Sequence, residues 1–141
     1  MLHRCALDHV DCTAIVIDID HFKRVNDSYG HLVGDVALKT LAGIMSVHLR
    51  PHDLLVRYGG EEFAILLTDT GIVKAKSIAE RLRSIVAASD IHSADLVFKI
   101  TISIGIASAK QEGKLEDFFA EADRAIYRAK EAGRNRVEIA G

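Results

Sequence analysis

The sequence predicts an α/β (α+β) domain in which helices surround a mixed central β-sheet of about five strands. Strand-like and helix-like segments alternate along the 141 residues in the order β-α-β-β-α-β-α-β, with one hairpin among them, which is typical of a mixed sheet covered by helices. The length suits one domain over residues 1–141. A content of 49% hydrophobic residues with a single proline is that of a globular chain.

The first predicted strand is Cys12–Ile19, an apolar and β-branched run up to Asp18, as in a buried central strand. A short helical piece is expected at Phe22–Asp27. Apolar residues then recur at helical spacing over Val33–Leu49. This helix should stop at Arg50, because a residue that precedes proline disfavours the helical region.

Two further strands, Leu54–Tyr58 and Glu61–Leu67, flank Gly59-Gly60, which predicts a two-residue hairpin turn. An amphipathic helix is expected over Ile72–Ala88.

The last part of the chain predicts a strand over Val97–Ala107, a helix over Leu115–Ala132 and a short strand over Arg136–Ile139. Gly133 directly follows this helix, at the position where glycine commonly ends one.

Charge and hydropathy exclude several classes of protein. A formal net charge of −2 argues against a nucleic-acid polymer as partner, because such proteins usually carry a basic stripe. No run approaches the roughly 18 apolar residues of a membrane span, and the N-terminus lacks the apolar core of a signal peptide. The seven histidines lack the paired spacing of a zinc site. We therefore expect a cytoplasmic chain without membrane contact.

A carboxylate at the end of the first predicted strand is the first candidate site. Asp18 interrupts the apolar run at the carboxyl end of the strand, where ligands of α/β sheets usually bind. Burying a bare carboxylate is costly unless a cation or hydrogen bonds compensate it, and Mg²⁺ prefers oxygen ligands of this kind. The alternative is that Asp18 and Asp20 only cap the helix that follows.

The Gly59-Gly60 turn with Glu61 and Glu62 is the second candidate. Two glycines permit a tight reversal with positive φ and let a ligand approach the backbone closely. Neighbouring strand residues alternate faces, so only one of the two carboxylates should point towards Asp18. On turn chemistry alone, a solvated acidic turn is the commoner interpretation.

Together these segments resemble the GGDEF family of diguanylate cyclases. The stretches DIDHFKRVND, YGHLVGD and RYGGEEF occur in the family's order and spacing, and TISIGIA (Thr101–Ala107) and ADRAIYRAKEAGRNRV (Ala122–Val137) follow them. The resemblance covers nearly the whole chain from about Thr13 onward, and agreement of several motifs is far more specific than one short pattern. It implies a nucleotidyl-cyclase-like fold whose hairpin carries the signature loop.

The resemblance implies a two-metal active site. Two Mg²⁺ ions per site, or Mn²⁺ in their place, would be bound by Asp18, the main-chain carbonyl of Ile19 and Glu61, with Glu62 assisting. Asp18 and Glu61 would be the catalytic carboxylates, and Glu61 would also help to deprotonate the attacking 3′-hydroxyl.

The resemblance also implies contacts with the substrate phosphates. The main-chain amides of His21, Phe22 and Lys23 would bind them, as amides at a helix start do for anions. Positive charge would come from Lys23, Lys130 and Arg134. Without the family context, cations near a helix C-terminus are explained equally well by the helix dipole.

Asn26 and Asp35 occupy the positions at which the family binds guanine. An acidic group can accept hydrogen bonds from the guanine N1–H and amino groups, donors that adenine does not offer. The simpler alternatives are a turn residue for Asn26 and a solvated helix residue for Asp35.

The activity implied is the condensation of two GTP molecules into cyclic di-GMP and two pyrophosphates. One copy of the site accommodates one GTP, so two antiparallel chains must face each other, and a two-fold homodimer is implied. We expect a sensor or dimerisation domain, absent from this sequence, to regulate it.

An RxxD motif formed by Arg50 and Asp53 lies five residues before Gly59-Gly60. This spacing matches the family's product-inhibition site, at which cyclic di-GMP binds away from the catalytic loop, and Arg81 occupies the position of a further arginine contact. The planar guanidinium suits bidentate binding of phosphate. Alternatively, Arg50 satisfies the end of its helix and Asp53 begins the next turn.

The chain departs from the family at its start. Family domains usually begin with a helix and a DxLTGLxNR-like stretch, whereas only Leu2–Val10 precede the first strand here, so we expect an N-terminally shortened domain.

Two other functions stay open: a non-catalytic module that binds cyclic di-GMP or GTP, and another two-metal nucleotidyl cyclase or polymerase. The intact Gly59–Phe63 loop favours a working cyclase.

Overall fold

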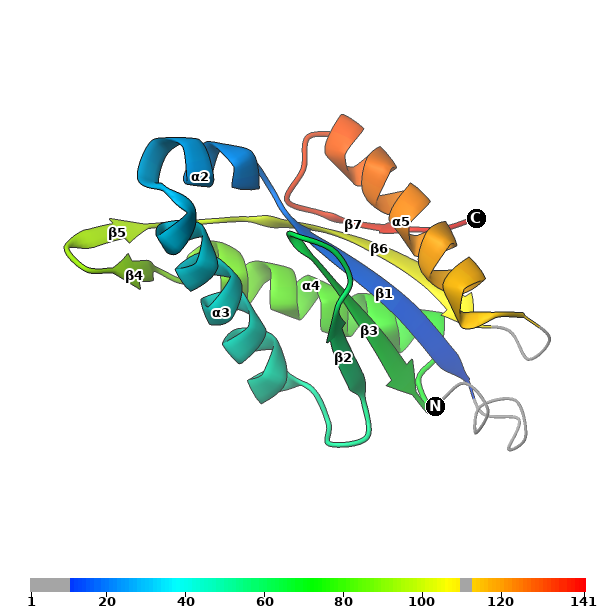
Figure 1. The fold of residues 1–141 in the computed structure, drawn as a ribbon. Coiled ribbons are helices and arrows are strands. Elements are labelled where there is room, and N and C mark those ends of the chain that lie inside the picture. Colours follow the sequence, from blue (N-terminus) through cyan, green and yellow to red (C-terminus); the bar gives the residue numbers. More distant parts are fainter. Residues whose placement is uncertain (1–10, 110–112) are drawn as a thin grey trace.

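The computed structural model describes residues 11–109 and 113–141. Its central sheet has five strands in the order β2-β3-β1-β6-β7 (Figure 1). The central strand β1 (Cys12–Ile19) is antiparallel to β3 (Glu62–Thr68) and to β6 (Ile102–Ala109). At the edges, β2 (Leu54–Arg57) is antiparallel to β3 and β7 (Val137–Ile139) is parallel to β6. The predicted mixed five-stranded sheet is confirmed.

Four helices flank the sheet in the described part of the chain: α2 (Phe22–Tyr29), α3 (His31–His48), α4 (Ile72–Ala88) and α5 (Leu115–Glu131). Side chains of α3 and α4 pack on one face of the sheet and those of α5 on the other. None of the described helices is both long and apolar enough to cross a membrane.

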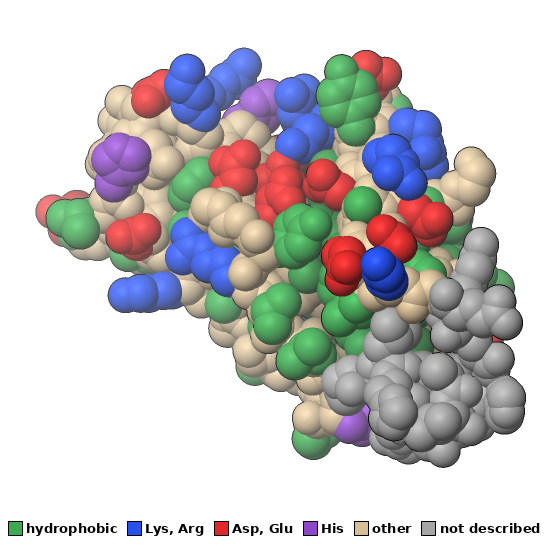
Figure 2. Space-filling model, turned by 45° about the vertical axis from the view of Figure 1, so that its right-hand side comes forward, with side chains coloured by type: hydrophobic (Ala, Val, Ile, Leu, Met, Phe, Trp, Pro, Cys, Tyr) green, Lys and Arg blue, Asp and Glu red, His purple; other side chains and the backbone are tan. Residues whose placement is uncertain are grey.

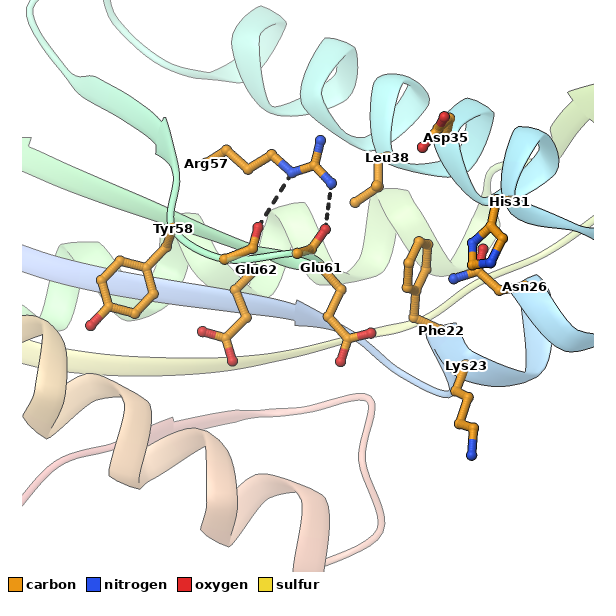
Figure 3. Close-up of a pocket in the computed structure, with 12 residues that line it drawn as sticks. Phe22, Lys23, Asn26, His31, Asp35, Leu38, Arg57, Tyr58, Glu61 and Glu62 are labelled. Carbon is orange, nitrogen blue, oxygen red and sulfur yellow. Dashed lines mark hydrogen bonds between the residues drawn. The ribbon is translucent and has the colours of Figure 1, made fainter.

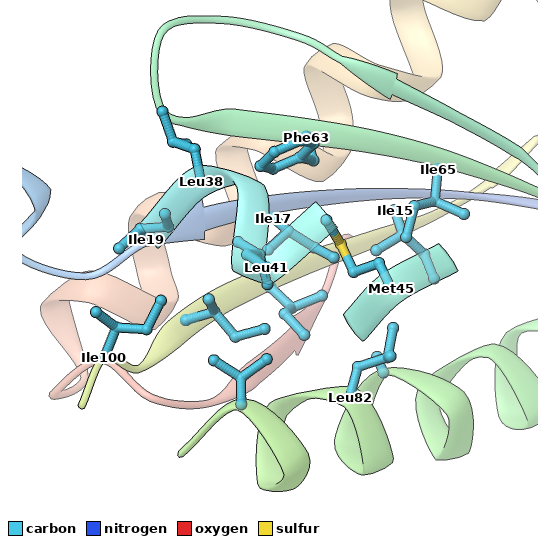
Figure 4. Close-up of a cluster of buried hydrophobic side chains, with 14 of the residues drawn as sticks. Ile15, Ile17, Ile19, Leu38, Leu41, Met45, Phe63, Ile65, Leu82 and Ile100 are labelled. Carbon is cyan, nitrogen blue, oxygen red and sulfur yellow. The ribbon is translucent and has the colours of Figure 1, made fainter. Parts of the chain in front are cut away.

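The alternation of side chains along β1 divides them between two hydrophobic cores. Ile15, Ile17 and Ile19 pack among residues of α3 and α4 (Figure 4). Ala14 and Val16 lie in the second core, with residues of α5. This alternation has period two, so Asp18 points to the same side as Val16, towards α5.

Helix α5 lies directly against the backbone of β6. A Cβ added at Gly105 would lie 1.8 Å from the carbonyl oxygen of Ala122, so a glycine is required for this close approach. This contact brings α5 close to the sheet. Lys130, near the carboxyl end of α5, reaches Asp18.

The predicted strand Val97–Ala107 is wrong at its start. The chain instead forms a separate hairpin of β4 (Ile91–Ser93) and β5 (Leu96–Phe98), and β6 begins only at Ile102. Buried or half-buried apolar residues continue at every second position across the break, so the pattern could not reveal where the chain leaves the sheet. The ring of Phe98 contacts Tyr29 of α2 at a centroid distance of 5.4 Å.

Helix boundaries also differ from the predictions. Helix α2 continues to Tyr29, and α3 begins at His31 because Gly30, with φ of 93°, makes the break between them. Helix α5 ends at Glu131, followed by Gly133 with φ of 122°, as the glycine predicted.

Candidate active site

The carboxyl end of β1 places Asp18 in a buried position beside α5. The side chain is 1% exposed, and its Oδ2 atom forms an ion pair with Lys130 Nζ. The other oxygen, Oδ1, has no hydrogen-bond partner in the described part of the chain. Burial raises the pKa of Asp18, and Lys130 opposes this only in part. A cation beside Oδ1 would therefore stabilise this carboxylate.

Glu61 and Glu62 lie next to Asp18 at the start of β3. The Cα of Glu62 is the register partner of Asp18, and the main-chain carbonyl of Glu61 accepts a hydrogen bond from Ile19 at 3.5 Å. Both glutamate side chains extend to the same side of the loop (Figure 3). The expectation that only one of them turns towards Asp18 is wrong, because Glu61 precedes the strand and strand alternation does not apply to it.

Negative charge exceeds positive charge around Lys130. Burial raises the pKa of Glu61, and the charge of Asp18 adds to the effect. Burial, then the charges of Asp123 and Asp18, raise the pKa of Glu62 to about 7. Burial works against the ammonium of Lys130, but its hydrogen bond to Asp18 and the surrounding carboxylates raise its pKa overall. One face of the molecule carries a group of acidic side chains, with basic side chains above and beside it (Figure 2).

The connection between β2 and β3 is a four-residue loop, Tyr58–Glu61, and not the predicted two-residue turn. Neither Gly59 nor Gly60 has a positive φ, which corrects the expected reason for the two glycines. Instead, a Cβ would meet little at either position, so the loop presents bare backbone. The guanidinium of Arg57 holds it by donating to the carbonyls of Gly59, at 3.3 Å, and of Gly60.

The predicted phosphate-binding amides lie at the start of α2, immediately after Ile19 and Asp20. His21 precedes the helix with a left-handed φ of 56°, and no described side chain caps this helix end. Lys23 is exposed on the first turn. Uncapped amides at a helix start are suited to binding an anion.

A cavity of about 650 Å³ opens between α2, α3 and the β2–β3 loop, a size typical of small-molecule sites. It is lined by six of the predicted residues (Figure 3): Phe22, Lys23, Asn26, Asp35, Glu61 and Glu62. Asn26 Oδ1 is buried without a partner in the described part of the chain, whereas Asp35 is exposed.

Four further residues line this cavity and were not predicted: His31, Leu38, Arg57 and Tyr58. Leu38 belongs to the apolar pattern of α3, so nothing in the sequence distinguishes it from a core residue. The position of Arg57 directly before the loop could have drawn attention to it.

The loop after α5 approaches the start of α2 from the other side. The main-chain N–H of Asn135 donates to Asp20 Oδ2 at 3.0 Å. Arg134 therefore belongs to a segment tied to the turn before α2, while Lys130 contacts Asp18 from the last turn of α5.

The donor set fits a hard divalent cation. In residues 11–109 and 113–141, no three His, Cys, Asp or Glu side chains already converge as a metal-binding group. Mg²⁺ commonly takes only one or two carboxylates and completes its shell with water and substrate phosphates. Asp18, with its unpartnered Oδ1, and the neighbouring Glu61 offer such ligands, and Glu62 and the Ile19 carbonyl lie beside them.

The second set of predicted residues gathers at a different pocket. Arg50, Asp53 and Arg81 line a cavity of about 250 Å³ between the end of α3 and the face of α4. Arg50 donates to Asp53 Oδ1 at 3.1 Å, to the Thr68 carbonyl at 2.7 Å and to Thr70 Oγ1 at 2.6 Å. The structural alternative is present in part: Asp53 forms the turn after α3 by accepting from the Arg50 main-chain N–H at 2.9 Å, but these described contacts of the Arg50 guanidinium lie outside the end of α3. Arg81 is an exposed cation beside them.

Comparison with known proteins adds the family context. The family described as "Diguanylate cyclase, GGDEF domain" matches residues 1–136. The chain is 45% identical over 133 residues to diguanylate cyclase DgcP of Pseudomonas aeruginosa, covering 94% of this chain and 20% of that protein. It is 39% identical over 141 residues to response regulator PleD of Caulobacter vibrioides, covering 97% of this chain and 31% of PleD. The chain spans less than a third of the length of these relatives.

Solved structures agree in fold. The GGDEF domain of DgcB from Caulobacter crescentus, in complex with c-di-GMP, has a TM-score of 0.90 at 30% identity and covers 96% of this chain and 81% of that one. The active GGEEF domain of a diguanylate cyclase from Vibrio cholerae has a TM-score of 0.89 at 33% identity, covering 98% and 88%.

Proposed function

Because the chain belongs to the GGDEF-domain family of diguanylate cyclases, we propose that it condenses two GTP molecules into cyclic di-GMP. One observation carries the proposal: a cavity of about 650 Å³ lined by the carboxylates of the β2–β3 loop and by polar residues of α2 and α3. The carboxylates would bind the metal ions that accompany the phosphates of a nucleotide, and the polar residues would form hydrogen bonds with its base.

Asp18 and Glu61 are the proposed metal ligands, with the Ile19 carbonyl completing the site and Glu62 assisting. Two Mg²⁺ ions, or Mn²⁺, when bound would neutralise phosphate charge and favour the ionised 3′-oxygen. The excess of carboxylates around Lys130 and the unpartnered Oδ1 of Asp18 support this assignment.

The phosphates would lie at the start of α2. The main-chain amides of His21, Phe22 and Lys23 would donate to them, and Lys23, Lys130 and Arg134 would add positive charge. Support comes from the absence of a side-chain cap on this described helix end and from the general affinity of such ends for anions.

Asn26 and Asp35 would bind the guanine base from the far wall of the cavity. Asp35 accepts from N1–H and the amino group, and Asn26, with its buried and unpartnered Oδ1, offers a further polar contact. Adenine lacks that pair of donors, so GTP is preferred over ATP.

The reaction forms a bond between O3′ of one GTP and the α-phosphorus of the other, and breaks the bond from that phosphorus to pyrophosphate. Glu61 helps to accept the hydroxyl proton, and a second, equivalent transfer closes the ring and releases the second pyrophosphate. Since each chain would hold one GTP, two chains act together as a two-fold homodimer. Most of the acceleration comes from positioning and charge neutralisation.

Arg50, Asp53 and Arg81 are proposed to bind the product, cyclic di-GMP, and so inhibit the enzyme. Their pocket shares no lining residue with the cavity of the active site.

We also propose that the protein acts in the cytoplasm, where GTP is available, and that a neighbouring sensor or dimerisation domain controls the approach of the two copies.

The test is pyrophosphate release from GTP and Mg²⁺ by the unmodified chain and by Glu61→Ala. We expect turnover in the unmodified chain and a loss of roughly a hundredfold or more in the variant, since the metal ion that Glu61 would hold supplies several kcal/mol of transition-state stabilisation. Glu116→Ala, which removes an exposed carboxylate on α5, is the control and should keep full activity. Unchanged turnover in Glu61→Ala would refute the metal site. Binding of GTP or cyclic di-GMP without turnover would favour the non-catalytic module.

A further inference from the structure

Asp20, close to the candidate active site, has none of the roles proposed above. It is 5% exposed, and both of its oxygens are engaged. Oδ1 accepts a hydrogen bond from Ser103 Oγ at 2.6 Å, and Oδ2 accepts from Thr101 Oγ1 at 2.7 Å and from the Asn135 N–H at 3.0 Å. Asp18, by contrast, keeps an unpartnered oxygen. Asp20 is therefore not an open ligand position.

The partners of Asp20 come from segments far apart in the sequence. Thr101 directly precedes β6, Ser103 is the second residue of that strand, and Asn135 lies in the loop after α5. The main-chain N–H of Asp20 also donates to the Thr101 carbonyl at 2.9 Å. Asp20 thus joins the turn before α2, the start of β6 and the loop that carries Arg134.

The backbone around Asp20 is held in an uncommon conformation. His21, Arg134 and Asn135 have φ angles of 56°, 66° and 47°, in the left-handed region that residues with a side chain rarely adopt. Such conformations persist only where surrounding contacts impose them, and they cluster at functional sites. Asp20 precedes the first of these residues and hydrogen-bonds the third.

We propose that Asp20 is a positioning residue that holds Arg134 beside the phosphate-binding start of α2, acting through the main chain of Asn135. The inference rests on the proposed function, because the GTP phosphates are what Arg134 would bind. Arg83 of α4 gives the same loop a second anchor by donating to the Asn135 side-chain oxygen at 2.8 Å. Asp20 itself would touch neither the substrate nor the metal.

Asp20→Asn and Asp20→Ala separate positioning from charge. Asparagine keeps an oxygen that can accept from the Asn135 N–H, and its amide can donate to the Ser103 hydroxyl, which can rotate to accept. Alanine removes every one of these contacts. The positioning role therefore predicts that Asp20→Asn behaves much like the unmodified chain and that Asp20→Ala does not.

The first measurement is hydrogen exchange at the Asn135 amide in the nucleotide-free protein. We expect exchange to be at least about tenfold faster in Asp20→Ala, the change that corresponds to loss of one hydrogen bond to a charged group. It should be nearly unchanged in Asp20→Asn and in Ser103→Ala, which removes a donor outside the loop. Unchanged protection in Asp20→Ala overturns the proposal. If that variant does not fold, Asp20→Ser, whose side chain is too short to reach Asn135, replaces it.

The second measurement compares the affinities for GTP and guanosine by calorimetry. Asp20→Ala should weaken GTP binding about tenfold and leave guanosine binding unchanged, because only the phosphate contacts move. In an Arg134→Ala background it should cause no further loss, as expected when one residue acts through the other. Equal damage in Asp20→Asn and Asp20→Ala, or full additivity with Arg134→Ala, contradicts the positioning role. If the unmodified chain binds no GTP, the proposed function fails, while the exchange result still decides the role of Asp20.

Discussion

Around Lys130, single residues create a site with more negative charge than the protein itself neutralises. Asp18, Glu61 and Glu62 all have raised pKa values, with burial as the largest cause of each. Among the described residues, Lys130 is the only positively charged group that lowers the pKa of these three carboxyl groups. Such an arrangement stabilises a bound cation and disfavours the empty, fully ionised state.

Glu62 gives this imbalance a measurable pH dependence. Its pKa rises from 4.5 to about 7 on folding, so between these values the folded state keeps a proton that the unfolded state has lost. The free energy of unfolding therefore falls as pH rises through this window. In the metal-free protein, Glu62→Gln should be more stable than the unmodified chain at pH 8, and the difference should vanish towards pH 5.

Thermal melts of both proteins across this pH range test the prediction. Glu116→Gln, the same substitution at an exposed position of α5, is the control for a glutamate-to-glutamine change outside the site. A Glu62→Gln variant that gains no stability between pH 5 and pH 8 would show that Glu62 is ionised at little cost.

For the carboxylates of the candidate site, the sequence predicts which residues lie close together but not how their side chains are oriented. Asp18 is predictable because it interrupts an apolar strand, and Glu61 and Glu62 are predictable because they follow two glycines. The orientation of Glu61 depends on where β3 begins, and strand alternation does not determine that position. Asp20 could be noticed only as an acidic neighbour, since its partners Thr101, Ser103 and Asn135 are distant in the sequence.

Among the elements, α3 forms one wall of the candidate active-site cavity, and its two glycines differ sharply in their surroundings. A Cβ at Gly34 would lie 1.9 Å from Asn26 Oδ1, whereas a Cβ at Gly43 would meet nothing within 4 Å. The atom met by Gly34 is the end of a side chain, which can move without unfolding the helix. The glycine therefore leaves room for Asn26 in its position beside the cavity.

Gly34→Ala should displace Asn26 and weaken GTP binding about tenfold, as expected for loss of a polar contact to the base. Gly43→Ala is the matched control on the same helix. It should leave the affinity for GTP unchanged. It should also stabilise the protein by about 0.5–1 kcal/mol, because glycine in a helix interior is less favourable than alanine by that amount. Calorimetry and thermal melts of both variants provide the test. Equal GTP affinities in the two variants would contradict the assignment of Asn26 to the base.

Most elements could be predicted from periodicity, because long apolar patterns determine strands and helices strongly. The break between β5 and β6 could not, since apolar residues alternate through it. The reason for Gly105 was also hidden: the close approach of α5 to β6 is a tertiary contact that leaves no local pattern.

Across the whole molecule, the two candidate pockets use separate residues, so product binding can be tested apart from catalysis. Arg50 is an unsuitable variant for this purpose, because it also bonds Asp53, Thr68 and Thr70, and its loss would destabilise the fold. Arg81 is exposed on α4 and offers a cleaner change.

Arg81→Ala should weaken cyclic di-GMP binding about tenfold, as expected for loss of a charge-assisted hydrogen bond to phosphate. Its melting temperature and its initial rate with GTP should stay unchanged. Lys76→Ala, which removes an exposed cation of α4 that does not line the pocket, is the control. If product inhibition is equal in Arg81→Ala and Lys76→Ala, the regulatory assignment fails.

The most direct test of the cyclase itself is the identity of its product. The chain is incubated at high concentration with GTP and Mg²⁺, and the products are identified by mass spectrometry at several chain concentrations. We predict cyclic di-GMP and pyrophosphate, with a rate per chain that rises with concentration, because two chains must meet. GTP that remains intact, or a product other than cyclic di-GMP, would contradict the account.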